Sequence, residues 1–159
     1  MFQVGDKIVH PMHGAGIVDG IVERRVNGVT RSYYSLKLPV GGMQVMIPTE
    51  STDAIGVRPV VPPQEAEAVL AALARIEVEV DQNWNRRYRE NMLRLKSGDL
   101  IEVARVVKAL MRREMERGLS NVERKMLHSA KQILISEIVM SESTSYEEVE
   151  ARINQTLAQ

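Results

Sequence analysis

The first sixty residues consist of short, β-prone runs separated by glycine and proline. Over residues 31–38, every second side chain would lie on the same face of an extended chain, and the two faces differ in character, which is typical of a β-strand. Asn27-Gly28 precedes this run, and this pair favours a type I′ turn, so it predicts a β-hairpin. Gly16 and Gly20 interrupt the strand before the turn and predict a bulge or a sharp bend. Strands are expected at 7–10, 15–23, 31–38 and 43–47, which together predict a small twisted β-barrel.

Residues 57–63 contain three prolines, and the pattern changes to a helical period after them. Pro63 suits the first position of a helix, and Gly98 and Gly118 suit helix ends. Ser120 and Ser145 each have a glutamate three residues later, as in a capping box, and Asp99 has the same spacing. Helices are expected at 65–76, 84–96, 100–117, 121–140 and 146–157. The predicted fold class is α+β with two domains: a β-barrel at 1–58 and an all-α helical bundle at 59–159.

Composition restricts the possible functions. The chain has 159 residues and contains no cysteine, which excludes disulfides, thiolate zinc sites, iron–sulfur clusters and a cysteine nucleophile. No apolar run approaches the roughly 20 residues of a membrane helix, and the N-terminus does not resemble a signal peptide. We therefore expect a cytoplasmic monomer with no membrane partner.

The formal net charge of zero conceals a strong segregation of charge. Residues 84–131 contain thirteen basic and six acidic side chains, a net charge of +7. The flanking segments 63–83 and 132–159 each contain one basic and five acidic side chains, a net charge of −4. A basic centre of this kind indicates a polyanionic partner.

Motifs for catalysis are missing. His10 and His13 have no evident third metal ligand, and a turn beside a strand explains them better. Gly14-Ala15-Gly16 is half of a dinucleotide fingerprint, but no helix follows it. There is no phosphate-binding Gly-Lys-Ser/Thr loop and no nucleophile elbow. The sequence therefore predicts a protein that is not an enzyme, with no catalytic residue, metal, cofactor or small-molecule substrate.

The basic centre begins with a helix that carries three arginines and the only tryptophan, over 83–89. Cations in the first turn of a helix oppose its dipole, at a cost of roughly 0.3–1 kcal/mol each, and such local conflicts are expected at functional sites. On the next helix Arg105, Lys108 and Arg112 are spaced to form a basic stripe on the face opposite the apolar one. Basic residues on successive helices beside an exposed aromatic side chain suit contact with nucleic-acid phosphates.

Two interpretations of Trp84 stay open on pattern alone. Trp84, Tyr88, Met92 and Leu95 are spaced as one stripe of a helix, so Trp84 fits the first position of a buried row. Alternatively, it is exposed and stacks on, or wedges between, bases. The arginines likewise fit either a solvated helix face or a DNA-binding surface.

Five motifs stand out along the chain. The N-terminal one is VGDKIVHPMHGAG at 4–16. The C-terminal ones are NWNRRY at 83–88, SGD at 97–99, RREMERGLS at 112–120 and ERKML at 123–127. Together they resemble the CarD/CdnL family of bacterial transcription regulators, and the N-terminal motif is also similar to the polymerase-interaction module of transcription-repair coupling factors. The resemblance covers essentially the whole chain. It implies a Tudor-like β-domain that binds the β subunit of RNA polymerase and a helical domain that contacts promoter DNA, largely without sequence specificity.

The resemblance also implies roles for individual residues. Trp84 corresponds to a tryptophan that wedges into the minor groove at the upstream edge of the melted bubble and stabilises the open promoter complex. The residues expected to contact DNA beside it are Arg86, Arg87, and Arg124 or Lys125. The residues expected to contact polymerase are Arg24, Val26 and Met46, with Arg24 on an edge strand. Met46 stands where a related protein has a second arginine, so an apolar contact is expected to replace an ion pair there. The alternative function is a protein–protein adaptor that binds polymerase or a repair factor without functional DNA contact.

Overall fold

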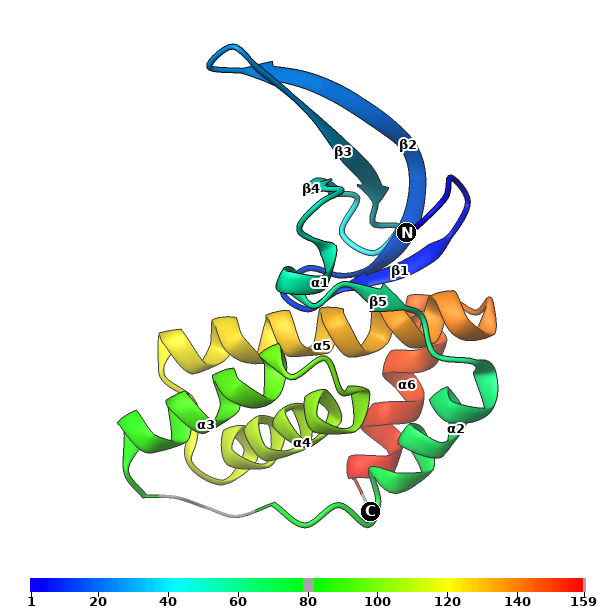
Figure 1. Cartoon of the computed structure of the whole chain (residues 1–159). Helices are drawn as coiled ribbons and strands as arrows, with labels where there is room; N and C mark the ends of the chain where they lie inside the picture. The colour runs from blue at the N-terminus through cyan, green and yellow to red at the C-terminus, as the bar shows by residue number, and fades with distance from the viewer. Residues whose placement is uncertain (79–81, 159) are drawn as a thin grey trace.

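The computed structural model describes residues 1–78 and 82–158, and Figure 1 shows a strongly curved β-sheet standing on a layer of helices. The strands are β1 (Lys7–His10), β2 (Gly14–Val26), β3 (Val29–Lys37), β4 (Gln44–Pro48) and β5 (Arg58–Pro59). The helices are α1 (Thr52–Ile55), α2 (Pro63–Ala72), α3 (Trp84–Lys96), α4 (Leu100–Arg117), α5 (Asn121–Glu142) and α6 (Tyr146–Leu157). The predicted fold class, a β-rich part followed by helices, is confirmed; the short elements α1 and β5 were not predicted.

The β2–β3 hairpin dominates the sheet. Asn27 and Gly28 have φ angles of 52° and 78°, as the predicted type I′ turn requires, and Val26 pairs with Val29 across it. The pairing register shifts between Val18 and Gly20, which confirms the predicted bulge.

The sheet order is β4-β3-β2-β1-β5, so β2 is not an edge strand, contrary to the expectation for Arg24. The pairing of β1 with β2 nevertheless ends at residues 14–17. Beyond the bulge β2 therefore pairs with β3 alone, and its other backbone edge is open at Arg24. Figure 1 shows this end of the hairpin projecting away from the helices.

The two larger buried clusters lie in the two parts of the chain, and a small third one, of Val9, Ala15 and Met140, lies where they meet. The concave side of the sheet buries an aliphatic cluster that includes Ile8, Val18, Leu36 and Ile47. The helices bury a larger cluster, to which α2, α3, α4, α5 and α6 all contribute. With one phenylalanine and one tryptophan in the sequence, both cores depend on close packing of aliphatic side chains.

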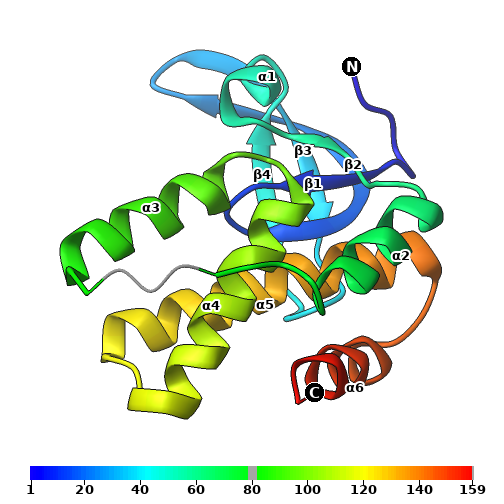
Figure 2. The ribbon, with the colours of Figure 1, turned by 90° about the horizontal axis from the view of Figure 1, so that it is seen from below.

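Helix α5 is the central element of the molecule. Its residues 133–138 are all buried, which identifies a helix with neighbours on every side. Seen from below, α4 crosses α5 with α3 beside it, while α2 and α6 lie toward the other end of α5 (Figure 2). The predicted caps organise these helices, because the side chains of Asp99, Ser120 and Ser145 each accept a hydrogen bond from a first-turn amide.

The basic stripe predicted on α4 is wrong at Lys108, which is buried. Its side chain is only 4% exposed, and its ammonium group donates to the carbonyl oxygens of Leu73 (2.6 Å) and Ile76 (2.7 Å). It thus satisfies carbonyl groups just beyond α2, which ends at Ala72, four residues before the predicted end. Lys108 is a structural residue, so it cannot belong to an exposed basic surface.

The sheet rests directly on α5. Gly14 has a φ of +101°, and a Cβ atom there would lie 2.6 Å from the hydroxyl oxygen of Ser136. The absence of a side chain lets β2 approach α5 closely enough for the amide of Ala15 to donate to that hydroxyl at 2.9 Å. The ammonium group of Lys7 donates to the carbonyl of Met140 at 3.0 Å.

A buried ion pair completes this junction. The carboxylate of Glu137 on α5 is 0% exposed and accepts two hydrogen bonds from the Arg58 guanidinium, at 2.6 and 2.7 Å. It also accepts from the amide of Val61 at 3.0 Å, and Arg58 donates through Nε to the carbonyl of Gly98 at 2.6 Å. One carboxylate therefore connects β5, the proline-rich segment and α5.

We predict that Glu137→Gln destabilises the protein by about 3–5 kcal/mol, because it leaves the Arg58 guanidinium without its counter-charge. Urea denaturation measures the change, with Glu114→Gln as a control on the exposed face of α4 that should stay within about 0.5 kcal/mol. Equal denaturation midpoints for Glu137→Gln and the parent protein would show that the ion pair does not stabilise the junction.

Candidate functional site

The structure places Arg24, Val26 and Met46 on one face of the sheet. Side chains alternate along a strand, and residues directly opposite across strands share a face. Met46 lies opposite Ser35, and Ser35 lies opposite Gly20, four residues before Arg24 on β2. This face is opposite the one that contributes Val18, Leu36 and Ile47 to the core of the sheet. The three side chains therefore point to the same side of the sheet. Along the direction of β2, Arg24 lies about 13 Å beyond Gly20, the residue level with Met46.

The open end of this face carries an unfavourable charge pair. Arg24 lies directly opposite Arg31, and both side chains are exposed. Like charges at directly opposed positions destabilise an antiparallel pair. Next to them Val26 and Val29 expose 51% and 57% of their surfaces. Two adjacent exposed arginines and two exposed valines gain from contact with a partner that supplies acidic and apolar groups.

A second surface lies where the first turns of α3 and α5 meet. Trp84 is 39% exposed, so the structure excludes its burial in the core, where Leu95 does lie. Its ring stacks on Tyr88 with a centroid separation of 5.4 Å and an interplanar angle of 9°. Its indole N–H is 3.4 Å from the hydroxyl oxygen of Ser120, the N-cap of α5. The indole is thus oriented from one edge while part of its surface faces solvent.

Exposed cations accompany Trp84. Arg86 lies in the first turn of α3, and Arg124 and Lys125 follow the N-cap of α5, all three with exposed side chains. The guanidinium of Arg124 donates to the carbonyl of Leu119 at 3.0 Å, which holds it beside the N-terminus of α5. Two helix N-termini with adjacent cations form a favourable environment for phosphate groups.

Arg87 has a different environment from the other predicted DNA contacts. Its side chain is 11% exposed, and its Nε lies 2.8 Å from Oε2 of Glu123. Burial favours the neutral form of Glu123, but the hydrogen bond and charge of Arg87, the charge of Arg113 and a hydrogen bond from Ser120 outweigh it. Together they hold the pKa of this carboxyl below its usual value.

Ser120 and Glu123 join this surface although sequence reasoning did not assign them to it. The Ser120 hydroxyl accepts from the amide of Glu123 at 3.2 Å and donates to Oε1 of the same residue at 3.3 Å. The capping-box spacing predicted this local pair. No local signal indicates that Trp84 and Arg87, each 36 residues away, complete the cluster.

The two N-terminal histidines lie at the end of β1 (His10) and in the turn that follows it (His13). Burial, together with the charge of His13, lowers the pKa of His10 to about 4, and its neutral Nδ1 accepts from the amide of Met12 at 3.1 Å. Within residues 1–78 and 82–158, no three His, Asp or Glu side chains are grouped to hold a metal ion. None of the helices in that part of the chain combines the length and apolar character needed to cross a bilayer.

Comparison with known protein families matches the two parts of the chain to two family models. The family model "CarD-like/TRCF RID domain" matches residues 2–61, and "CarD, C-terminal domain" matches residues 68–154. The chain belongs to the CarD family. Members of the family are transcription regulators and interaction modules linked to RNA polymerase. The resemblance recognised in the sequence is confirmed.

A similar protein from Bacillus subtilis (strain 168) carries the name "Putative transcription factor YdeB". It is 38% identical to this CarD-family chain over 138 residues, which cover 87% of this chain and 90% of the relative. The similarity therefore extends through both the sheet and the helices, and a role in transcription regulation connected with RNA polymerase is supported for the chain as a whole.

We predict that Trp84→Ala lowers the free energy of unfolding by about 1 kcal/mol, since an exposed ring loses mainly its stacking on Tyr88. Leu95→Ala is the matched control: the leucine is buried in the same helix, and its truncation should cost about 2–5 kcal/mol. Chemical denaturation compares the two variants. A loss for Trp84→Ala as large as that for Leu95→Ala would assign the tryptophan to the core.

Proposed function

We propose that this CarD-family protein binds the β subunit of RNA polymerase through the face of the sheet that carries Arg24, Val26 and Met46, the hairpin face. We further propose that it binds promoter DNA through the surface around Trp84. In this proposal it stabilises the open promoter complex, with Trp84 as a wedge at the upstream edge of the bubble. In this proposal residues 1–58 bind polymerase and residues 59–159 bind DNA. The protein acts as a monomer in the cytoplasm, where polymerase and the nucleoid are.

The observation that carries the proposal is the exposure of Trp84 between two helix N-termini. An amphipathic aromatic ring at the surface, flanked by Arg86 and by the cations at the start of α5, provides a stacking or wedging group together with phosphate contacts. Such a surface recognises the backbone and the deformability of DNA rather than a base sequence. This supports contact with a minor groove that is already opening.

The hairpin face supports the polymerase contact. The open backbone edge of β2 allows pairing with a strand of a partner, and Arg24 opposite Arg31 favours an acidic surface. Val26 adds exposed apolar area, and Met46 lies on the same face. An apolar contact at Met46 is the proposed replacement for the second arginine that the sequence comparison led us to expect.

Tethering explains how a chain without net charge can act on DNA. Insertion of a side chain into a base step costs a few kcal/mol of unstacking, so the wedge works best at DNA that polymerase has begun to melt. Binding through the hairpin raises the effective concentration of the DNA-contacting surface at that place. The acidic flanking segments meanwhile limit binding to bulk DNA.

We predict that Arg24→Glu weakens capture of RNA polymerase by at least tenfold without lowering the melting temperature, since it also removes the like-charge pair with Arg31. The reason is that reversal of an exposed charge removes its attraction to an acidic partner. The control is Arg25→Glu, the next residue of β2, whose side chain points to the opposite face. Immobilised protein and purified polymerase provide the binding measurement. If both variants bind equally, the proposed face is wrong.

We predict that Arg86→Glu and Arg87→Glu each reduce DNA affinity and flatten its salt dependence. Every phosphate contact that is lost lowers the slope of log K against log salt by about 0.9. Arg87→Glu should also destabilise the protein, because it places a second carboxylate beside Glu123.

Arg89→Glu, an exposed site on the same helix, serves as the control for net charge in this titration. Fluorescence anisotropy with a short duplex, measured at several salt concentrations, distinguishes the variants. Parallel salt slopes for Arg86→Glu, Arg89→Glu and the parent protein would mean that Arg86 makes no phosphate contact. That result would favour the adaptor function, in which the helices are only a scaffold.

A further inference from the structure

The middle of the hairpin face is apolar. Tyr33 lies directly opposite Val22 on β2 and Pro48 on β4, and all three side chains are half-buried. The next residue, Tyr34, is 2% exposed and belongs to the core of the sheet. Successive side chains of a strand point to opposite faces, so Tyr33 points away from that core. Tyr33 is therefore the central side chain of the hairpin face.

Polar groups border this apolar middle on both sides. Toward the turn, the next row consists of Arg24 and Arg31, which are both exposed. Toward the helices, the side-chain amide of Gln44 donates to the hydroxyl of Ser35 at 2.8 Å and to the carboxylate of Asp19 at 3.3 Å. An apolar centre surrounded by a polar rim is the usual anatomy of a protein–protein interface.

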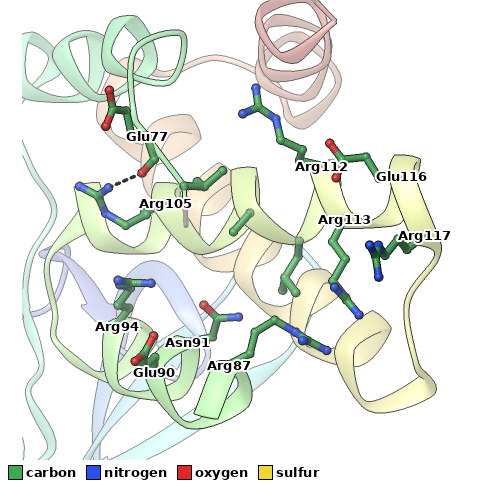
Figure 3. A pocket seen from close by; sticks show the side chains of 13 residues that line it. Glu77, Arg87, Glu90, Asn91, Arg94, Arg105, Arg112, Arg113, Glu116 and Arg117 are labelled. Carbon is green, nitrogen blue, oxygen red and sulfur yellow. Dashed lines mark hydrogen bonds between the residues drawn. The ribbon is translucent and has the colours of Figure 1, made fainter. Parts of the chain in front are cut away.

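The helical part of the chain presents a different kind of surface. Figure 3 shows the pocket between α3 and α4, whose labelled side chains are arginines, glutamates and one asparagine. Arg105 in this pocket donates to the carbonyl of Glu77 at 2.8 Å. A highly charged surface suits charged partners, whereas the apolar middle of the hairpin face suits an apolar side chain of another protein.

Gly20 leaves an open space beside Tyr33. It lies opposite Ser35, in one row with Met46, and Tyr33 lies diagonally across from it. A Cβ atom at Gly20 would have no atom of the described chain within 4 Å, apart from its neighbours in sequence. Its φ also lies outside the left-handed region, so the free protein does not require glycine here. Uncovered backbone of this kind lets another chain approach closely.

We propose that the open space over Gly20 receives an apolar side chain of RNA polymerase, and that Tyr33 supplies most of the binding energy of this contact. The inference rests on the proposed function, which assigns polymerase to this face, and adds where the contact is centred. A tyrosine ring provides a large apolar area, and its cross-strand neighbours already restrict it, so binding costs little conformational entropy. Arg24 at the rim attracts an acidic partner from a distance and acts mainly on the rate of association.

The kinetics of purified polymerase binding to the immobilised full-length protein separate these two roles. Tyr33→Ala should weaken affinity at least tenfold, mainly through faster dissociation, and by a similar factor at low and high salt, because salt does not screen an apolar contact. The effect of Arg24→Glu should lie mainly in association and diminish at high salt. Ile21→Ala is the control, since Ile21 is exposed but lies opposite Tyr34 on the other face, and it should stay within about twofold.

Gly20→Gln tests the open space independently of Tyr33. The added side chain has room in the free protein, so the melting temperature should not fall, but it occupies the space that the partner needs. Polymerase affinity should therefore fall at least tenfold. Thr30→Gln is the matched control, because Thr30 lies opposite Arg25 on the other face of the hairpin. Thermal melting verifies that each variant is folded, and Gly20→Gln decides the test if Tyr33→Ala is not.

The outcomes distinguish this inference from the proposed function. If the parent protein binds polymerase and Arg24→Glu weakens binding, but a folded Tyr33→Ala or Gly20→Gln variant binds like the parent, the inference is overturned and the proposed function stands. A loss on Ile21→Ala equal to that on Tyr33→Ala would also overturn the inference, because the effect would not be confined to the hairpin face. Absence of binding by the parent protein would contradict the proposed function itself.

Discussion

Burial of Glu137 in the middle of α5 requires a counter-charge and hydrogen bonds, and the segment that joins the sheet to the helices supplies them. Arg58 neutralises the carboxylate and the amide of Val61 completes its hydrogen bonding. The same guanidinium donates to the carbonyl of Gly98 at the turn between α3 and α4. A buried ion pair adds little net stability compared with apolar packing, but it is strongly directional. Here it fixes the angle at which the sheet meets the helical layer.

This junction gives the two candidate surfaces a defined geometry. The hairpin face projects from the sheet on one side of α5, and the Trp84 surface lies at the N-terminal end of the same helix. If one surface binds polymerase and the other binds DNA, α5 determines where the DNA contact falls relative to the enzyme. A rigid connection also preserves the gain in effective concentration that tethering provides.

Local features of the sequence were sufficient to predict most elements of the fold. The Asn27-Gly28 turn, the bulge before Gly20 and the cap at Ser120 each depend on residues a few positions apart. The features that were missed join distant parts of the chain. Lys108 was assigned to an exposed stripe because its spacing fits one, yet its partners lie 32 and 35 residues away, beyond α2. Charge and helical period do not distinguish a solvated lysine from one that caps another helix.

The same limit applies to the candidate site. Spacing alone left Trp84 undecided between core and surface, because its exposure depends on the packing of α3 against α4 and α5. The pairing of Arg87 with Glu123 spans 36 residues and leaves no local signal. The family resemblance suggested a role for Trp84. The structure adds that its indole N–H donates to the Ser120 hydroxyl, which in turn donates to Glu123.

The lifetime of the open promoter complex tests the central claim most directly. Competitor-challenged complexes are followed with the parent protein, with Trp84→Ala and with Leu93→Ala. Leu93 is an exposed apolar residue on the face of α3 opposite Trp84 and serves as the control. The account predicts that the parent protein and Leu93→Ala prolong the lifetime, and that Trp84→Ala loses most of this effect while polymerase binding is unchanged. A full extension of the lifetime by Trp84→Ala would contradict the wedge.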